Sequence, residues 1–307
     1  MREHVLQMSR DCGCDVAAVE AAIDKAGGIY QVAPPTDCPA VDVLIPFHAA
    51  DALWVADAVL SAQLSEHVRP IVHVVADGCE FPSDLQPDVM RYRTPGGWGP
   101  YRIQNSLVRH GHCRSEYLAI LDADDTMTPE RLWRHVALLR EHGADMVSSA
   151  VRNVAADDSE STRKHLAWQT VVRPAVTFPT CPDGRCVNTC RTMRRSFFEV
   201  VNGWSDMRCT GDFALDNRCR PWAKIIDDQH ICGTRRVHHR SLSHGVAPMG
   251  SPDRQRDIEI VMQHLEQLRL NPTLATAARL GSLNTAPPLT QLASVCETGD
   301  RRIDRCN

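Results

Sequence analysis

The chain has 307 residues, of which 43% are hydrophobic, and a formal net charge of −4 at neutral pH. This size can bury one sizeable core, and the slightly acidic balance excludes a general attraction to nucleic acid or anionic membranes. No apolar run approaches 18 residues and the first residues lack a signal-peptide pattern, so we expect a cytoplasmic protein without a transmembrane segment.

Residues 1–37 predict a small helical unit and a linker. The stretch AAVEAAIDKAGG contains good helix formers and ends in glycines, which commonly terminate helices. The stretch VAPPTDCPA contains three prolines, which exclude regular structure. The helical unit faintly suggests two short helices around a turn, a shape found in small DNA-binding motifs.

Residues 38–250 predict one α/β domain in which strands alternate with helices. The expected strands are VDVLIPF, PIVHVVADG, MRYRT, EYLAILD and ADMVSSAV. The first expected helix, DALWVADAVLSAQLS, places Leu53, Val59 and Leu60 on one face. This alternation predicts an α/β fold with a mostly parallel central sheet flanked by helices.

Two further helices of this domain carry clear boundary signals. In GGWGPYRIQNSLVRHG, Pro100 occupies the first turn and a glycine ends the helix. In TPERLWRHVALLREHG, Thr128 is expected as the N-cap and Pro129 as the first helical residue. Residues 251–307 form a C-terminal appendage that begins with the predicted helix SPDRQRDIEIVMQHLEQLRL, and its tail after Asn271 either wraps the domain or stays loose.

Three aspartates, Asp122, Asp124 and Asp125, follow the predicted strand EYLAILD and include a D-x-D pattern. Such close carboxylates resist burial unless a cation or hydrogen bonds compensate their charge. Parallel sheets bind ligands beyond the carboxyl ends of their strands, so these side chains belong to a ligand-binding mouth. The residues predict a Mn2+ or Mg2+ site, and the alternative is a simple cap of the following turn.

The 13 cysteines leave two interpretations open. The cluster within residues 181–232 comprises Cys181, Cys186, Cys190, Cys209, Cys219 and Cys232. These residues are either separate thiols or part of a zinc site, although only Cys186 and Cys190 have the spacing of a ligand pair.

The order of the motifs resembles family 2 glycosyltransferases with the A-type nucleotide-sugar-binding fold. VDVLIPFHAADALWVADAVLSAQL, VVADG, GPYRIQNSLVRHG and EYLAILDADDTMTPERL carry this resemblance, followed by TCRTMRRSFFEVVNGW, GDFALDNRCR and RVHHRSLS. The last segment fits an R-x-H-x-x-S-x-S pattern through Arg236, His238, Ser241 and Ser243. The resemblance covers residues 41–245. It implies a metal-dependent, inverting, hexosyltransferase-type enzyme that moves a sugar from a nucleoside-diphosphate sugar, with UDP expected, to a hydroxyl acceptor.

The resemblance also implies roles on the donor side of the site. Asp125 is the expected direct metal ligand, Asp124 contacts the ribose and the metal, and Asp122 supports the turn. His238 is expected to contact the metal or the diphosphate, although His239 adjoins it. A structural role for His238 is the alternative.

Three other residues are expected to bind the nucleotide. Asp77 matches an aspartate that contacts the base, although Ala76 and Cys79 depart from the usual D-D-G-S pattern. Pro46 is expected to line the nucleobase slot through its backbone. Arg102 either pairs with a phosphate or is an exposed helix arginine.

Asp212 is the predicted general base, because an inverting transfer needs a carboxylate that takes the proton of the acceptor hydroxyl. Capping of its helix is the alternative. The family usually has Glu-Asp where this chain has Gly211 and Asp212.

Other functions remain as alternatives at this stage. A nucleotidyltransferase uses a related sheet and the same cation, but PFHAADALW lacks its usual glycine-rich basic loop. A catalytically dead relative is disfavoured by the intact aspartates. The acceptor is open: it is a glycan, a small molecule or a modified, hydroxymethylated nucleic-acid base.

Overall fold

The structure is a computed structural model that describes residues 30–160, 162, 190–219, 222–241 and 251–292. The predicted N-terminal helical unit, Cys181, Cys186, Ser243 and the end of the tail lie outside the described residues. The same holds for most of residues 151–190, where acceptor specificity is expected.

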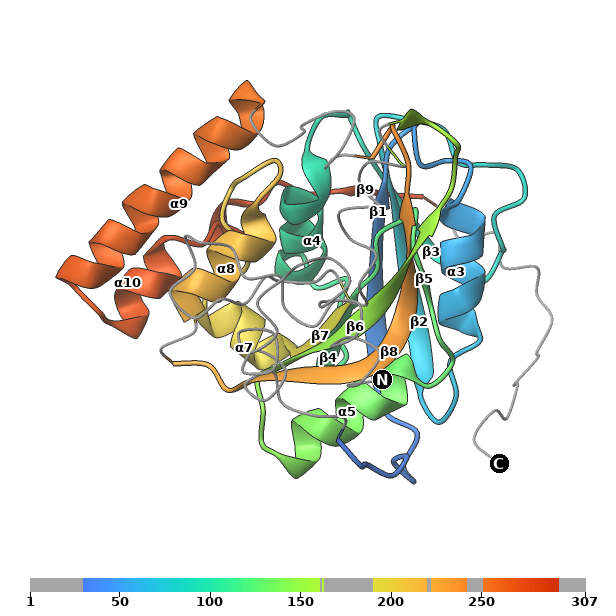
Figure 1. The fold of residues 1–307 in the computed structure, drawn as a ribbon, viewed down its shortest axis with the longest axis horizontal. Helices are drawn as coiled ribbons and strands as arrows, with labels where there is room; N and C mark the ends of the chain where they lie inside the picture. Colours follow the sequence, from blue (N-terminus) through green and yellow to red (C-terminus); the bar gives the residue numbers. More distant parts are fainter. Residues whose placement is uncertain (1–29, 161, 163–189, 220–221, 242–250, 293–307) are drawn as a thin grey trace, which may run out of the picture.

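A single nine-stranded sheet forms the centre of the described part (Figure 1). Its order is β5-β8-β6-β7-β4-β1-β2-β3-β9. The strands are β1 (Ala40–Phe47), β2 (Arg69–Asp77), β3 (Met90–Thr94), β4 (Tyr117–Ile120), β5 (Thr126–Met127), β6 (Met146–Ala155), β7 (Arg191–Arg194), β8 (Ile225–Val237) and β9 (Thr290–Gln291).

The strand pairing makes this sheet mostly parallel, as predicted. Strands β1, β2, β3, β4, β6 and β8 point one way, and β5, β7 and β9 point the other way. The five predicted strands correspond to β1, β2, β3, β4 and β6. Because β1, β2, β3 and β4 share one direction, their carboxyl ends lie at one edge of the sheet.

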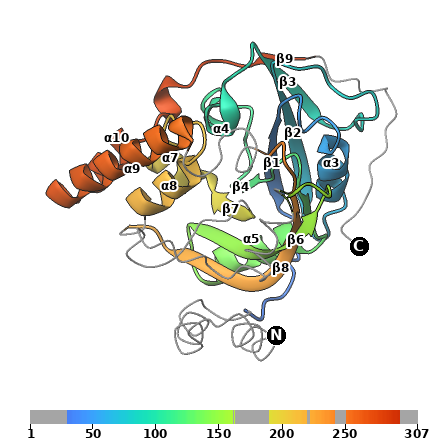
Figure 2. The same cartoon turned by 45° about the horizontal axis from the view of Figure 1, so that its top comes forward.

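Helices cover both faces of the sheet. They are α3 (Val55–Gln63), α4 (Gly99–Arg109), α5 (Arg131–Glu141), α7 (Arg195–Val200), α8 (Gly211–Cys219), α9 (Pro252–Leu270) and α10 (Leu274–Arg279), with a short 3-10 helix at Leu283–Thr285. Figures 1 and 2 show α8, α9 and α10 grouped on one side of the sheet and α3 on the other. Among the described helices, none combines the length and apolarity that a membrane span needs.

Two apolar cores result from the alternation of side chains along the strands. Val43 and Ile45 of β1 pack with α3 and α5 on one face, through residues such as Val59 and Leu132. Leu44 of the same strand points to the other face and packs in the cluster formed with α4, α7 and α8. Because both faces of the central strands are buried, these strands consist of nearly continuous apolar residues, as expected for a sheet covered on both sides.

Two local predictions are wrong. Leu53 and Leu60 are exposed, because α3 instead packs the small residues Ala58 and Ala62 against the sheet, together with Val59. Thr128 is not an N-cap and Pro129 is not the first helical residue, because residues 126–127 form β5 and Thr128 continues its pairing by donating its N–H to the Cys232 carbonyl. The helix α5 therefore begins only at Arg131.

The predicted helix of the C-terminal appendage is present as α9. The described residues that follow α9 wrap around the domain. From α9 the chain passes through α10 and returns across α4 to the far edge of the sheet, where β9 pairs with β3. On this path the Ala286 carbonyl accepts a hydrogen bond from the Arg109 guanidinium at 2.7 Å.

Candidate active site

The predicted donor-binding residues lie at or beside the carboxyl ends of β1, β2 and β4. Pro46 is the penultimate residue of β1, is buried, and pairs with Val75 of β2. Asp77 is the last residue of β2, and the three clustered aspartates follow β4 directly. The strand directions therefore bring together side chains that are far apart in sequence.

The carboxylates of Asp122, Asp124 and Asp125 converge, with ligand oxygens that all lie within 4.8 Å of one another. The Asp125 N–H donates to the Asp122 carbonyl at 3.1 Å and closes the turn. Burial, with Asp124 as the next cause, raises the pKa of Asp122 to about 7. Burial, followed by the charges of Asp124 and Asp122, raises the pKa of Asp125 well above its usual value. The negative charge is therefore poorly compensated by the protein.

The strand β8 completes this cluster from the other side. The Arg236 N–H donates to Asp125 Oδ1 at 3.0 Å, and its guanidinium donates to the Asp124 carbonyl at 3.2 Å. His238 Nε2 lies 2.9 Å from Asp124 Oδ2. His238 is 1% exposed and packs against Trp54, with ring centroids 4.2 Å apart. His238, not the exposed His239, therefore faces the aspartates.

Asp51 is a member of this site that sequence reasoning missed. Its carboxylate forms a second group of possible ligands with Asp124 and His238, again within 4.8 Å. Burial raises the pKa of Asp51 to about 6, and the neighbouring charge of Asp124 is the second cause. The sequence contained one signal for Asp51, because this residue stands four positions after the end of β1, at the same edge of the sheet.

These residues fit a hard divalent cation. The two groups share Asp124 and offer carboxylate oxygens, the ligands that Mn2+ and Mg2+ prefer. His238 adds a ring nitrogen, and its buried Nδ1 has no hydrogen-bond partner among the described residues. Burial, and after it the repulsion between neighbouring carboxylates, raises the pKa values of Asp51, Asp122 and Asp125, and a bound cation would offset both effects.

Asp77 anchors a glycine-rich loop at the start of α4. Its carboxylate accepts hydrogen bonds from the Thr94 hydroxyl at 2.5 Å, the Trp98 N–H at 3.1 Å and the Gly99 N–H at 2.9 Å. Gly78 must be glycine here, because its φ is +70° and a Cβ would lie 2.6 Å from the loop backbone. Asp77 thus shapes the mouth of the site, and its contact with a nucleotide base stays a prediction.

Arg102 lies on α4 at the same mouth and forms a two-pronged ion pair with Asp206. Its Nη2 lies 2.9 Å from Oδ2 and 3.1 Å from Oδ1 of that carboxylate. The Arg102 side chain is 40% exposed, so the pair is accessible to solvent. Its predicted contact with a phosphate is not tested by this arrangement.

Asp212 is the second residue of α8. Its Oδ1 accepts the Phe213 N–H at 2.9 Å and the Tyr101 hydroxyl at 3.0 Å. The charge of Asp212 is one of the causes of the raised pKa of Asp122, which places the two carboxylates close together. The structure therefore gathers a polar carboxylate, a buried acidic cluster and a histidine in one place.

Comparison with known families agrees with this geometry. The family model described as "Glycosyl transferase family 2" matches residues 72–201. This match covers 130 of the 307 residues, which is less than half of the chain. It supports a glycosyltransferase at the level of the family, in agreement with the motifs.

Solved structures of S. aureus TarS resemble the fold of this chain. TarS 1-349 in complex with UDP-GlcNAc has a TM-score of 0.57 at 14% identity, covering 77% of this chain and 69% of that chain. TarS 1-349 alone has a TM-score of 0.55 at 14% identity, covering 79% and 69%. A further TarS structure has a TM-score of 0.50 at 13% identity, covering 75% of this chain but 43% of that chain. The predicted A-type fold is confirmed, whereas the comparison with curated proteins gives no match.

The helix α9 lies outside the residues that match the family model, yet it supports the loop that leads to Asp212. Asp257 is 5% exposed, and its Oδ2 accepts the Arg208 N–H at 3.1 Å and the Cys209 N–H at 2.7 Å. The Arg208 side chain adds an exposed ion pair with Asp253 at 2.8 Å. The position of α8 therefore depends on the C-terminal appendage.

We expect Asp257→Ala to lower the free energy of unfolding by about 1–3 kcal/mol, because two N–H groups lose their acceptor. Misplacement of the loop should also slow turnover of a nucleotide sugar, without weakening UDP binding. The matched variant Asp257→Asn keeps an acceptor oxygen and should retain most of both properties. Urea denaturation, nucleotide-sugar hydrolysis and calorimetry with UDP measure the three effects, and equal behaviour of both variants would contradict this role.

The structure describes only part of the cysteine cluster, so separate thiols and a zinc site both stay open. Cys190, Cys209, Cys219 and Cys232 are buried, and none of them is part of a disulfide. None of them belongs to a group of three ligands among the described residues. The remaining two cysteines of the cluster lie outside the described part of the chain.

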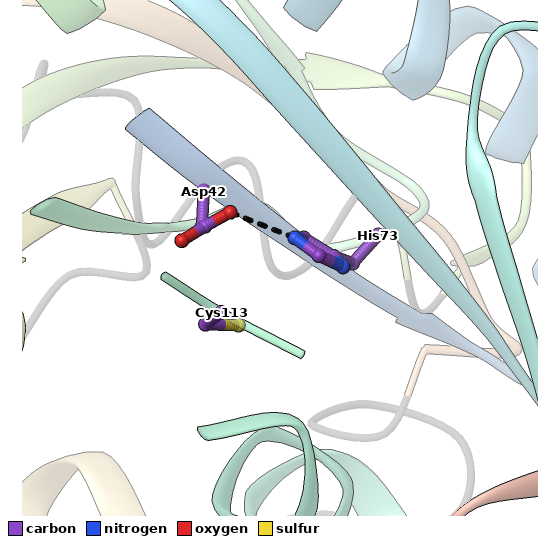
Figure 3. A group of neighbouring side chains, drawn as sticks. All are labelled: Asp42, His73 and Cys113. Carbon is purple, nitrogen blue, oxygen red and sulfur yellow. Dashed lines mark hydrogen bonds and ion pairs between the residues drawn. The ribbon is translucent and has the colours of Figure 1, made fainter. Parts of the chain in front are cut away.

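A third group of possible ligands, Asp42, His73 and Cys113, lies in the core beneath α4 (Figure 3). His73 Nε2 lies 2.8 Å from Asp42 Oδ1, and the Ser115 N–H donates to Asp42 Oδ2 at 2.7 Å. His73 Nδ1 lies 3.2 Å from the Tyr92 hydroxyl. Both carboxylate oxygens and both ring nitrogens thus have partners, which explains the group as a buried hydrogen-bond network.

Proposed function

We propose that the protein is a metal-dependent, inverting glycosyltransferase that moves a sugar from a UDP-sugar to an acceptor hydroxyl. The observation that carries this proposal is the convergence of Asp122, Asp124, Asp125 and His238 with Asp212 at one edge of the sheet. The family match at residues 72–201 supports the reaction class.

The donor half of the site is the acidic cluster. Asp124, Asp125 and His238 would hold Mn2+ or Mg2+, with Asp122 and Asp51 beside them. A bound cation supplies positive charge for the diphosphate that leaves the sugar. Pro46 and Asp77, at the neighbouring strand ends, would border the nucleobase, and Arg102 would approach a phosphate once its pair with Asp206 opens.

Asp212 supplies the base. The acceptor oxygen forms a bond to the anomeric carbon of the sugar. At the same time the bond between that carbon and the diphosphate oxygen breaks, and the electron pair of the broken bond leaves with the diphosphate. The proton of the acceptor hydroxyl passes to the Asp212 carboxylate. Attack from the face opposite to the leaving group inverts the anomeric carbon, so the proposal requires Asp212 to lie on the side of the sugar that is away from the diphosphate.

The identity of the donor is supported by the neighbours of the fold. TarS structures contain UDP-GlcNAc in one case and UDP in another. We therefore expect UDP to bind in preference to GDP and CDP. A nucleotidyltransferase is disfavoured because the family match is to glycosyl transferases.

Calorimetry with UDP, GDP, CDP and uridine in the presence of Mn2+ tests this function. UDP should bind more tightly than uridine, because the diphosphate and the cation supply much of the contact. UDP should also exceed the two other nucleotides. Failure of every nucleoside diphosphate to bind would remove the basis of the proposal. Hydrolysis of a panel of nucleotide sugars with Mn2+ then identifies the sugar, with UDP-GlcNAc as the first member.

A further inference from the structure

Among the described residues, Tyr101 donates the one side-chain hydrogen bond that reaches Asp212. It lies in the first turn of α4, next to the glycine-rich loop, and its hydroxyl donates to Asp212 Oδ1 at 3.0 Å. Its ring packs against Trp204, with centroids 5.3 Å apart. The hydroxyl is therefore held in place by a ring that is itself fixed in the core.

The start of α8 is built around this ring. A Cβ at Gly211 would lie 2.6 Å from the Tyr101 ring, so a larger residue at this position would displace it. Burial, with Asp212 and Asp122 as further causes, raises the pKa of the Tyr101 phenol well above its usual value. Tyr101 thus remains a protonated donor over the range in which the protein would work.

The two oxygens of Asp212 differ in their surroundings. Oδ1 accepts both the Tyr101 hydroxyl and the Phe213 N–H, at 3.0 and 2.9 Å. In the described structure no hydrogen bond reaches Oδ2. One oxygen is therefore fixed by the protein, and the other can accept a proton.

We propose that Tyr101 is a positioning residue for sugar transfer: its hydroxyl fixes Asp212 Oδ1 so that Oδ2 takes the proton of the acceptor. This inference rests on the proposed function, because it assumes that Asp212 is the base. Tyr101 contributes only a hydrogen bond to the reaction. The proton of the acceptor goes to Asp212, and the Tyr101 phenol keeps its own proton. The effect of Tyr101 must consequently disappear when the base is removed.

Tyr101→Phe tests the hydroxyl while keeping the ring. The assay is Mn2+-dependent hydrolysis of UDP-GlcNAc, or of the UDP-sugar that the panel shows to react fastest, with water as the acceptor. We expect kcat to fall about tenfold to a hundredfold, the range for a hydrogen bond to a charged group. The donor KM, the UDP affinity and the melting temperature should stay within twofold or a few degrees of wild type. A purely structural role would change stability without this separation of kcat from KM.

The matched control is Tyr117→Phe. The Tyr117 hydroxyl also has a polar partner, the Arg140 Nε at 3.1 Å, but this pair lies on α5 and β4, away from Asp212. Its loss should leave kcat unchanged. A kcat for Tyr101→Phe that equals that of the control would overturn the proposal.

The double variant Tyr101→Phe with Asp212→Asn separates this proposal from the function on which it rests. If Tyr101 acts through Asp212, the double variant should hydrolyse the donor as slowly as Asp212→Asn and no slower. If the two substitutions lower the rate by independent factors that multiply in the double variant, the positioning role is overturned. A slow Asp212→Asn beside a normal Tyr101→Phe would also overturn it but leave the proposed function standing. A normal Asp212→Asn would overturn both, because the base itself would then be wrong.

Discussion

Asp212→Asn is expected to slow sugar transfer by a factor of about 10² to 10⁴, the range typical of losing a general base. Asparagine keeps an oxygen that can accept the Tyr101 hydroxyl and the Phe213 N–H, so the local hydrogen bonds survive. It cannot take a proton at neutral pH. UDP affinity and the melting temperature should therefore stay close to those of wild type, and the loss should appear in the rate alone.

Asp37→Asn is the matched control for this variant. Asp37 is exposed and pairs with Arg140 far from the acidic cluster, so the same chemical change should leave the rate unaltered. If Asp212→Asn turns over within a few-fold of wild type with the fold intact, Asp212 only supports its helix. Asp206 and Asp216 would then be the next bases to test, although Asp216 is buried against Arg191.

Asp125→Asn is expected to abolish Mn2+-dependent UDP binding and, with it, activity. Asparagine keeps an acceptor for the Arg236 N–H, so the loop should remain folded. The missing negative charge weakens the cation site, because hard cations require carboxylate ligands. Activity of the wild type should likewise vanish in EDTA and return when Mn2+ is added in excess.

A stability measurement checks the same site without an acceptor. Mn2+ at about 100 times its Kd should stabilise the wild type by about 2.7 kcal/mol, whereas Asp125→Asn should gain little. Asp84→Asn changes an exposed aspartate that belongs to none of the groups of possible ligands, and it should respond like the wild type. Full activity in EDTA, or equal stabilisation of all three proteins, would show that the acidic cluster is not a metal site.

The donor side of the site could be predicted from local patterns. The aspartates at Asp77 and at residues 122–125 stand directly after apolar runs, and parallel strands bring such positions to one edge. Their placement is confirmed by the ends of β2 and β4. The pattern of residues around His238 singled out this histidine, which lies beside Asp124 in the structure, and its contact with a metal or diphosphate stays a prediction. The cation and the nucleotide themselves stay predictions.

The strands β7 and β8 were missed because their sequences do not alternate regularly. β8 contains four consecutive polar residues, 227–230, and its register with β6 shifts near Ser149 and Ala150. β7 is four residues long and begins with Arg191, which is buried through its pairing with Asp216. Long-range pairing, not local pattern, defines both strands.

The acceptor side was hidden for a related reason. The contact between Tyr101 and Asp212 joins residues 111 positions apart, and no periodicity reports it. Gly211 was the one local sign, since it stands where the family usually has a glutamate. The structure explains this departure, because the Tyr101 ring occupies the space that a side chain at position 211 would need.

The route of the C-terminal appendage has a consequence for the order of assembly during synthesis. The backbone carbonyl of Ala277 accepts from Arg218 at the end of α8, and Asp257 holds the loop at its start. Both partners leave the ribosome after the whole of the family-matched region and after His238. The part of the site that carries the acidic cluster can therefore form on the nascent chain before α9 and α10 fix the part that carries Asp212. A chain released early, near residue 250, would contain the acidic cluster and Tyr101 but would lack the contacts from Asp257 and Ala277 that hold the two ends of α8.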